Sequence, residues 1–173
     1  TYQFSFDYYL TEGAGGVKGA LFTDWNNPQQ AVALNTGSGS YAGEVTYGEG
    51  ATVAVGLDLT NFSGVAYMWN FQLTLKNGDG TNLLKNPGFK NKTLGGWAYD
   101  MGARLTTEEQ KGYCSAVLYD EKLIGLDDGK IYMMRLDGSK KIDNGHSITD
   151  TEIAGGDNAT VPNGTYVFSF DYY

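Results

Sequence analysis

The chain has 173 residues, a length that fits one domain, and its 20 acidic against 12 basic side chains give a net charge of −8. This balance argues against nucleic acid and anionic membranes as partners, because phosphate groups are bound by clustered Lys and Arg. Hydrophobic residues make up 41% of the chain, enough for a packed core, and 25 glycines stand against 3 prolines. Many glycines between short apolar runs favour an all-β fold with tight turns.

Short apolar runs bounded by turn residues predict a series of strands along the chain. In chain order we expect strands over residues 2–10, 17–23, 31–34, 41–47, 52–60, 65–75, 96–99, 113–118, 130–136, 146–153 and 165–173. Residues 104–110 are expected to form one helical turn. The stretch 76–81 holds no apolar residue and is the most linker-like part of the chain.

The first nine residues of the chain return as its last nine. Eight of the nine positions are identical, and only Gln3 against Val167 differs. Each copy alternates large apolar side chains with smaller or polar ones, as a strand does when one face is buried. The expected anchors are Tyr2, Phe4, Phe6 and Tyr8 in the first copy and Tyr166, Phe168, Phe170 and Tyr172 in the second. A compact domain has one place for such a strand. The second copy therefore either pairs with another molecule or belongs to a tandem array with a period of 164 residues (position 165 against position 1).

Three segments carry a resemblance to a known family. Residues 82–97 contain Asn-Leu-Leu-Lys-Asn-Pro-Gly-Phe and, further on, Gly-Gly-Trp; residues 161–173 run from Val-Pro-Asn-Gly-Thr-Tyr into Phe-Ser-Phe-Asp; and residues 67–75 end in alternating apolar positions. They resemble the opening, middle and closing strands of carbohydrate-binding-module-like jelly rolls, a group that includes xylan- and glucan-binding modules. The resemblance implies an antiparallel jelly-roll β-sandwich, circularly offset, with terminal strands shared between units. Residues 1–75 would be the C-terminal part of one sandwich, 76–81 a linker, and 82–173 the N-terminal part of the next or the same one.

The resemblance also bears on calcium. Members of the group commonly hold a structural calcium ion with Glu after the opening Phe and with an Asp pair in the closing strand. Here Lys90 follows Phe89, and Trp69 and Asn70 stand where the Asp pair would fall. A cation beside hard-ion ligands is unfavourable. We therefore expect this calcium site to be lost and no other cofactor to be needed, while a calcium site in the loops stays an open question.

No arrangement of residues in the sequence indicates catalysis. Cys114 and His146 are the only residues of their kinds, which excludes a disulfide framework and a two-His metal site. The acidic pairs are neighbours in polar loops, whereas a glycosidase needs two carboxylates that face each other across a cleft. We expect no enzymatic activity.

The sequence thus predicts a non-catalytic structural unit of an extracellular fibre or surface protein. Its partner would be copies of itself, linked head to tail through the duplicated strand. The alternative is a polysaccharide-binding module, in which flat aromatic rings stack on sugars and amides bind hydroxyl groups. Candidate sugar-binding residues are Trp25, Asn26, Tyr41, Trp97 and Tyr99. Four Asn-X-Ser/Thr sequences, at Asn61, Asn91, Asn158 and Asn163, agree with export, and no apolar run is long enough for a membrane-spanning helix. The sequence leaves open whether the units are covalently joined and which glycan would bind.

Overall fold

The computed structural model describes residues 1–24, 27–46, 54–84, 86–89, 97–99, 103–104, 114–119, 131–140 and 147–150. The regular elements in these ranges are strands and one short 3-10 helix. In chain order they are β1 (Tyr2–Leu10), β2 (Lys18–Asp24), β3 (Asn27–Ala33), β4 (Gly37–Val45), β5 (Ala54–Asp58), β6 (Val65–Leu75), β7 (Trp97–Tyr99), β8 (Ala103–Arg104), β9 (Cys114–Tyr119), β10 (Ile131–Asp137), η3 (Gly138–Lys140) and β11 (Ser147–Asp150).

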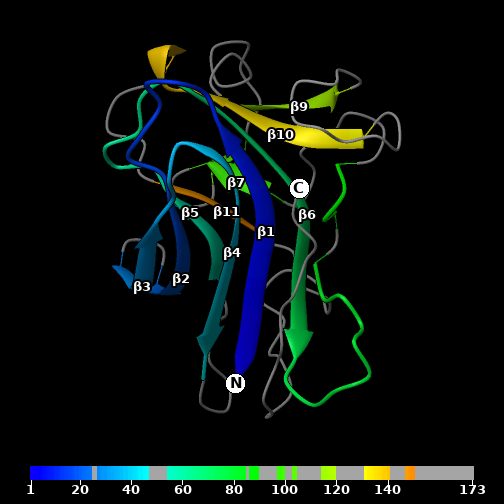
Figure 1. Cartoon of the computed structure of the whole chain (residues 1–173). Helices are drawn as coiled ribbons and strands as arrows, with labels where there is room; N and C mark the ends of the chain where they lie inside the picture. The colour runs from blue at the N-terminus through cyan, green and yellow to red at the C-terminus, as the bar shows by residue number, and fades with distance from the viewer. Residues whose placement is uncertain are drawn as a thin grey trace.

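The strands form two antiparallel sheets (Figure 1). One sheet has five strands in the order β4-β1-β6-β10-β9, and the other has six in the order β3-β2-β5-β11-β7-β8. Strands from before and after residues 76–81 are neighbours in both sheets, because β10 pairs with β6 and β11 pairs with β5. The described strands of the two expected halves therefore lie in the same pair of sheets.

One hydrophobic core joins the two sheets. Phe4, Phe6 and Phe71 belong to the five-stranded sheet and Val55 and Leu57 to the six-stranded sheet, and all five belong to one cluster of buried residues. A sheet with one apolar face must bury that face against another element. The all-β prediction is therefore confirmed, in the form of two sheets that pack over a shared core.

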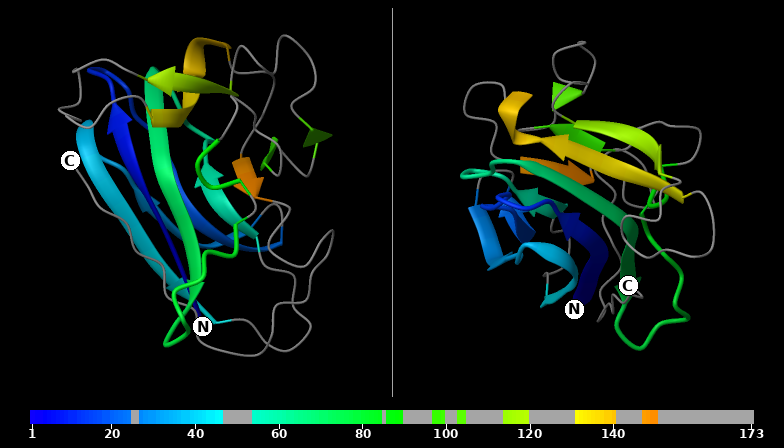
Figure 2. Two further views of the ribbon diagram at one scale, coloured as in Figure 1. Left: turned by 90° about the vertical axis from the view of Figure 1, so that its right-hand side faces the viewer. Right: turned by 45° about the horizontal axis from the view of Figure 1, so that its top comes forward.

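Strand β1 is an interior strand of its sheet. It pairs with β4 along Tyr2–Leu10 and with β6 along the same residues, so both of its hydrogen-bonding edges are occupied. Figure 2 shows from two further sides that β1 runs between β4 and β6. The predicted apolar face of this strand is confirmed: Tyr2, Phe4, Phe6 and Tyr8 are at most 5% exposed.

Most predicted strands lie close to observed ones, but β4 begins at Gly37, before the expected start at 41, and β8 was not expected and includes Arg104, the first residue of the expected helical turn. The strand expected over residues 65–75 is β6 with the same bounds, and that expected over 2–10 is β1. The strand expected over 31–34 is longer than predicted, because β3 begins at Asn27, ahead of Pro28. The last expected strand, 165–173, and nearly all of the expected helical turn lie outside the described residues.

The turn after β6 returns the chain along the same strand. Asn82 takes the place of a strand partner, because its Nδ2 donates to the Phe71 carbonyl and its Oδ1 accepts from the Leu73 amide. The Leu83 amide then donates to the Leu73 carbonyl at 2.8 Å. Further on, the buried Phe89 packs edge-on against the ring of Phe71. The segment that opens the family resemblance therefore contributes to the core on this side of β6.

A buried carboxylate ties β2 to β5. Asp58 accepts hydrogen bonds from the Thr60 hydroxyl and amide at 2.6 and 3.0 Å, and its other oxygen pairs with Lys18 at 3.1 Å. Burial alone would raise the pKa of Asp58, but the hydrogen bonds from Thr60 and the charge of Lys18 outweigh it and lower the pKa below its ordinary value. The charged form is thus the one that the folded protein stabilises.

We expect this carboxylate to make the unfolding free energy depend on pH. A lowered folded-state pKa gives stability that is present above the unfolded pKa, near 4, and is lost as the pH falls through the folded value. Asp58→Asn should cost about 1 kcal/mol at neutral pH through the lost ion pair, and the gap to wild type should narrow below about pH 4. Urea unfolding from pH 7 to pH 2 measures this. The exposed Glu12→Gln is the control, and a constant gap down to pH 2 would contradict the assignment.

Candidate assembly site in the five-stranded sheet

The place that β1 occupies between β4 and β6 is the candidate functional site, and we call it the β1 slot. Aromatic rings of β1 pack there against rings of the two neighbouring strands. The ring of Phe6 stacks on Tyr41 with centroids 5.1 Å apart and on Phe71 at 5.0 Å, and Phe4 lies 5.6 Å from Phe6. Fully burying a side chain of this size contributes about 2 kcal/mol, so the four anchors of β1 together favour the filled slot by roughly 8 kcal/mol before ordering costs.

Two glycines make room for the rings in the slot. A Cβ atom at Gly39 of β4 would overlap the Tyr8 ring, and one at Gly19 of β2 would overlap the ring of Tyr41. Tyr8 also accepts a hydrogen bond from the Asn35 amide through its hydroxyl oxygen. The slot is therefore shaped for large rings at fixed positions along β1.

The opposite face of β1 carries a polar cluster. Asp7 is 2% exposed, and its two carboxylate oxygens accept from Ser40 of β4 and Asn70 of β6, each at 3.3 Å. Asn70 has a left-handed backbone with φ of 54°, and the pairing of β6 with β1 shifts register beside it. This bulge brings the Asn70 amide to Asp7, so both neighbouring strands bind the carboxylate of β1.

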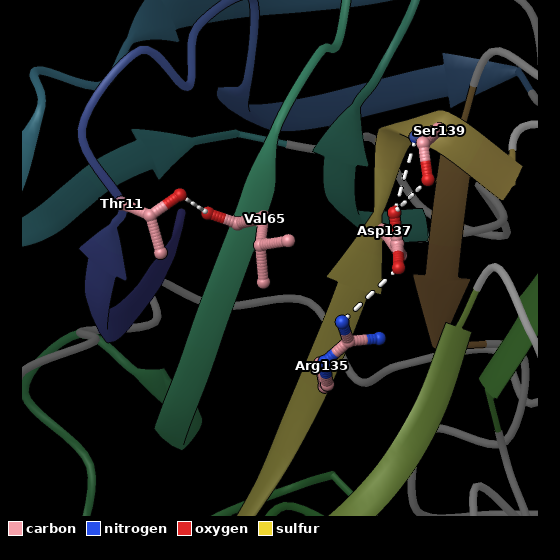
Figure 3. Close-up of polar contacts among 5 residues, drawn as sticks. All are labelled: Thr11, Val65, Arg135, Asp137 and Ser139. Atoms are coloured by element: carbon pink, nitrogen blue, oxygen red, sulfur yellow. Dashed lines mark hydrogen bonds and ion pairs between the residues drawn. The ribbon is translucent and has the colours of Figure 1, made fainter.

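The two ends of β1 are fixed by further contacts. At its start, Gln3 donates to Glu44 of β4, and the other oxygen of Glu44 pairs with Lys76 at 2.7 Å. The hydrogen bonds from Lys76 and then Gln3 lower the pKa of Glu44 below its usual value. At the far end, the Thr11 hydroxyl donates to the Val65 carbonyl (Figure 3), and the Thr11 amide donates to the same carbonyl.

Next to Val65, the end of β10 is held by its own polar contacts. Asp137 accepts from Arg135 at 3.0 Å and from the Ser139 hydroxyl and amide at 2.7 and 3.1 Å (Figure 3). The hydrogen bond from the Ser139 side chain is the largest of the effects that lower the pKa of Asp137. Because Asp137 pairs with Val65 across the two strands, this contact supports the edge to which Thr11 binds.

The sequence-predicted residues have different places. The four anchors of the first copy fill the slot with buried rings. The second copy, Trp25 and Asn26 lie outside the described residues. Trp97 and Tyr99 belong to β7, and their side chains are outside the described part. Tyr41 is 3% exposed and stacked on Phe6, so its ring is not available to a sugar on the surface, contrary to its selection as a sugar-binding candidate.

The buried hydroxyl of Tyr41 gives a simple test of its place in the core. This oxygen has no hydrogen-bond partner among the described residues, and burial raises the pKa of Tyr41 well above its usual value. Removing an unpaired buried hydroxyl group relieves its desolvation cost. We expect Tyr41→Phe to raise the unfolding free energy by about 1 kcal/mol in urea titrations, whereas a surface tyrosine would show no gain.

The sequence did not identify the polar and aromatic residues on the outer face of β1 and β6 as a candidate site. Tyr9 and Tyr67 face each other across β1 and β6 with ring centroids 6.5 Å apart, and both are only half-buried. Trp69 and Met133 form a second buried cluster beside them. The alternation in residues 1–9 placed Tyr9 on this face, but only the register with β6 shows which partners it meets.

Among the described residues, no group of three or more His, Cys, Asp or Glu side chains is arranged to hold a metal ion. No helix in the same ranges is long and apolar enough to cross a membrane.

Comparison with known proteins adds no identity: no family model matches this chain, and no significant similarity links it to a curated protein or to a solved structure.

Proposed function

We propose that the protein is a non-catalytic structural repeat whose units are joined head to tail through the duplicated strand. The observation that carries the proposal is the filled β1 slot. Residues 2–10 occupy it with both edges paired and all four anchors buried. A second strand of the same sequence has no room in that slot, so its matching place is the β1 slot of another unit.

The second copy has nearly every group that the slot binds. It repeats the four anchors and the carboxylate of the polar cluster, since Asp171 corresponds to Asp7, and it repeats Ser5 as Ser169. All of these positions are buried in β1. An unrelated strand that merely alternates would not supply a carboxylate between Ser40 and Asn70. The repetition of the buried polar positions therefore supports a shared binding place more strongly than the aromatic pattern does.

Counting strands and slots favours a tandem arrangement of units over exchange between separate chains. Each unit has one β1 slot, and a chain with both copies brings two strands. Exchange between identical chains fills no additional slot, while it costs translational and rotational freedom. In a tandem array each unit keeps its own β1, and the second copy begins the following unit. We also propose that the strands are connected as a jelly roll. An extracellular location, which the Asn-X-Ser/Thr sequences favour, belongs to the same proposal.

Deletion of β1 tests the proposal. A chain of residues 10–173 has an empty slot and one remaining copy of the strand, whereas residues 10–164 have an empty slot and none. We expect the first to fold, with the second copy in the slot of its own or a neighbouring chain, and the second to remain unfolded by circular dichroism. Residues 1–164 are the folded control. If 10–173 were as unfolded as 10–164, the second copy would not fit the slot and the proposal would fail.

The outer face of the five-stranded sheet supports a second candidate function, binding of a polysaccharide. The half-buried rings of Tyr9 and Tyr67 lie beside the polar cluster, where Ser40 and Asn70 are exposed. Aromatic rings next to amide and hydroxyl groups are the pattern that sugar-binding surfaces share. In the sugar-binding hypothesis, Tyr9 and Tyr67 on this face replace the buried Tyr41 as the candidate aromatic residues.

Affinity electrophoresis in xylan and β-glucan gels tests this second function. Tyr67→Ala should abolish retardation if this face binds the polysaccharide, and Trp25→Ala should leave it unchanged. The reverse result would move the site to the loop that contains Trp25. An unretarded wild-type protein would contradict binding of either polysaccharide.

A further inference from the structure

The two copies of the strand differ at one position, and the structure places that position at an ion pair. Gln3 donates a hydrogen bond to Glu44 of β4, and Glu44 pairs with Lys76, the residue that follows β6. Gln3 and Glu44 are also direct partners in the β1–β4 register. Val167, the counterpart of Gln3, has no donor to offer.

Every other residue of the nine is the same in both copies. The slot therefore cannot distinguish the two copies through the anchors or through Ser5, Asp7 and Tyr9. Any difference in affinity for the slot that comes from the nine side chains must arise at position 3. This is the position where β1 meets the ion pair between Glu44 of β4 and Lys76, the residue that follows β6.

We infer that Gln3, Glu44 and Lys76 form a selection contact, by which the β1 slot prefers the first copy of the strand over the second. The inference rests on the proposed function, since it presumes that both copies fit the slot. With Val167 in place of Gln3, Glu44 would keep Lys76 and lose the amide donor. One hydrogen bond to a charged, partly exposed acceptor corresponds to a preference of about threefold to tenfold. Such a preference keeps the strand of one unit from replacing that of its neighbour.

A competing effect acts at the same position. Valine has a higher strand propensity than glutamine, which favours the second copy. The Glu44→Ala background separates the two effects, because it removes the acceptor of the hydrogen bond and leaves the strand propensity of position 3 unchanged. The selection contact is the part of the preference that depends on Glu44.

Disulfide trapping in the full chain measures which copy occupies the slot. Ala42 of β4 is the direct partner of Ser5, and paired strand residues lie at a distance that a disulfide can span. Ser169 is the counterpart of Ser5 in the second copy. Chains with Ala42→Cys and Ser169→Cys, and with Cys114→Ala to remove the native thiol, are equilibrated in a glutathione buffer. Mass spectrometry then gives the fraction of the two introduced thiols that are joined to each other.

We expect a low fraction in the parent chain and a rise of about threefold to tenfold when Gln3→Val makes the two copies equal. Val167→Gln should give a similar rise. In the Glu44→Ala background, Gln3→Val should give no rise, or a fall that reflects valine's strand propensity alone in the first copy. An unchanged fraction on Gln3→Val in the parent background would overturn the selection contact.

Phe4→Ala distinguishes failure of this inference from failure of the proposed function. It removes a buried anchor from the first copy and leaves Gln3 in place, so the second copy should take the slot and the joined fraction should rise strongly. If Phe4→Ala raises the fraction and Gln3→Val does not, the second copy fits the slot without a selection contact. If neither variant yields joined thiols, the second copy does not enter the slot, and the proposed function falls with the inference.

Discussion

In a chain of residues 1–164, which lacks the second copy of the strand, Phe6→Ala is expected to lower the unfolding free energy by about 3–5 kcal/mol, the range for removal of a large aromatic side chain from a core. The Phe6 ring is fully buried and stacks on both Tyr41 and Phe71. The substitution therefore leaves a cavity between two rings that come from the strands on either side of β1. Interior strands cannot shift sideways to close such a cavity, because both edges are hydrogen-bonded.

The duplicated strand supplies a matched control for this substitution. Phe170 is the counterpart of Phe6 in the second copy, and Phe170→Ala should leave the stability of the unit almost unchanged, because the β1 slot is already filled. Urea unfolding at several protein concentrations measures both. In the full chain the second copy can replace a damaged first copy, so the loss in Phe6→Ala should be smaller than in residues 1–164, and the double variant should lose the full amount. A larger loss for Phe170→Ala than for Phe6→Ala would contradict the assignment of residues 2–10 to the slot.

Much of the fold could be predicted because buried strands leave a two-residue period. The alternation in residues 2–8 predicted the four anchors, and all four are buried. The sequence did not indicate that β1 is interior. Its polar residues Ser5 and Asp7 suggested a solvated face, yet both are buried, because Asp7 is bound by side chains from both neighbouring strands.

Strand β6 shows why register is harder to predict than the strand itself. Ala66 and Met68 are buried at even positions, whereas Phe71 and Leu73 are buried at odd ones. The change of face occurs at Asn70, whose positive φ forms the bulge. An Asn at the point where the apolar period changes phase is a signal that the sequence contained, since Asn tolerates the left-handed conformation.

The candidate site could be predicted only in its repeated part. Duplication identified the strand, and nothing in the sequence linked Gln3 to Glu44 and Lys76, because these residues meet only through pairing over long separations. Tyr41 shows the opposite error. Its ring was taken for a surface sugar ligand, but Gly19 on the facing sheet leaves space for that ring in the core.

Gly16→Ala is expected to be the most damaging small substitution in the turn that follows β1. Gly16 has a φ of 77°, and a Cβ atom there would overlap the backbone carbonyl of Asn61. The surroundings cannot give way easily, because Gly15 exchanges two backbone hydrogen bonds with Ser63 and the next residue, Val17, is fully buried. The left-handed conformation alone costs roughly 1–2 kcal/mol for a non-glycine residue. With the backbone clash we expect a total loss of about 3–4 kcal/mol.

Gly13→Ala isolates the two contributions. Gly13 has the same φ of 77°, and in the part of the chain that the structure describes no atom lies within 4 Å of a Cβ atom at that position. It should therefore show the conformational cost of about 1–2 kcal/mol and nothing more. Urea unfolding of the two variants gives the clash as their difference. Equal losses would mean that residues 61 and 62 move away from the turn without cost, and the contact between this turn and the chain before β6 would then not hold β1 at its far end.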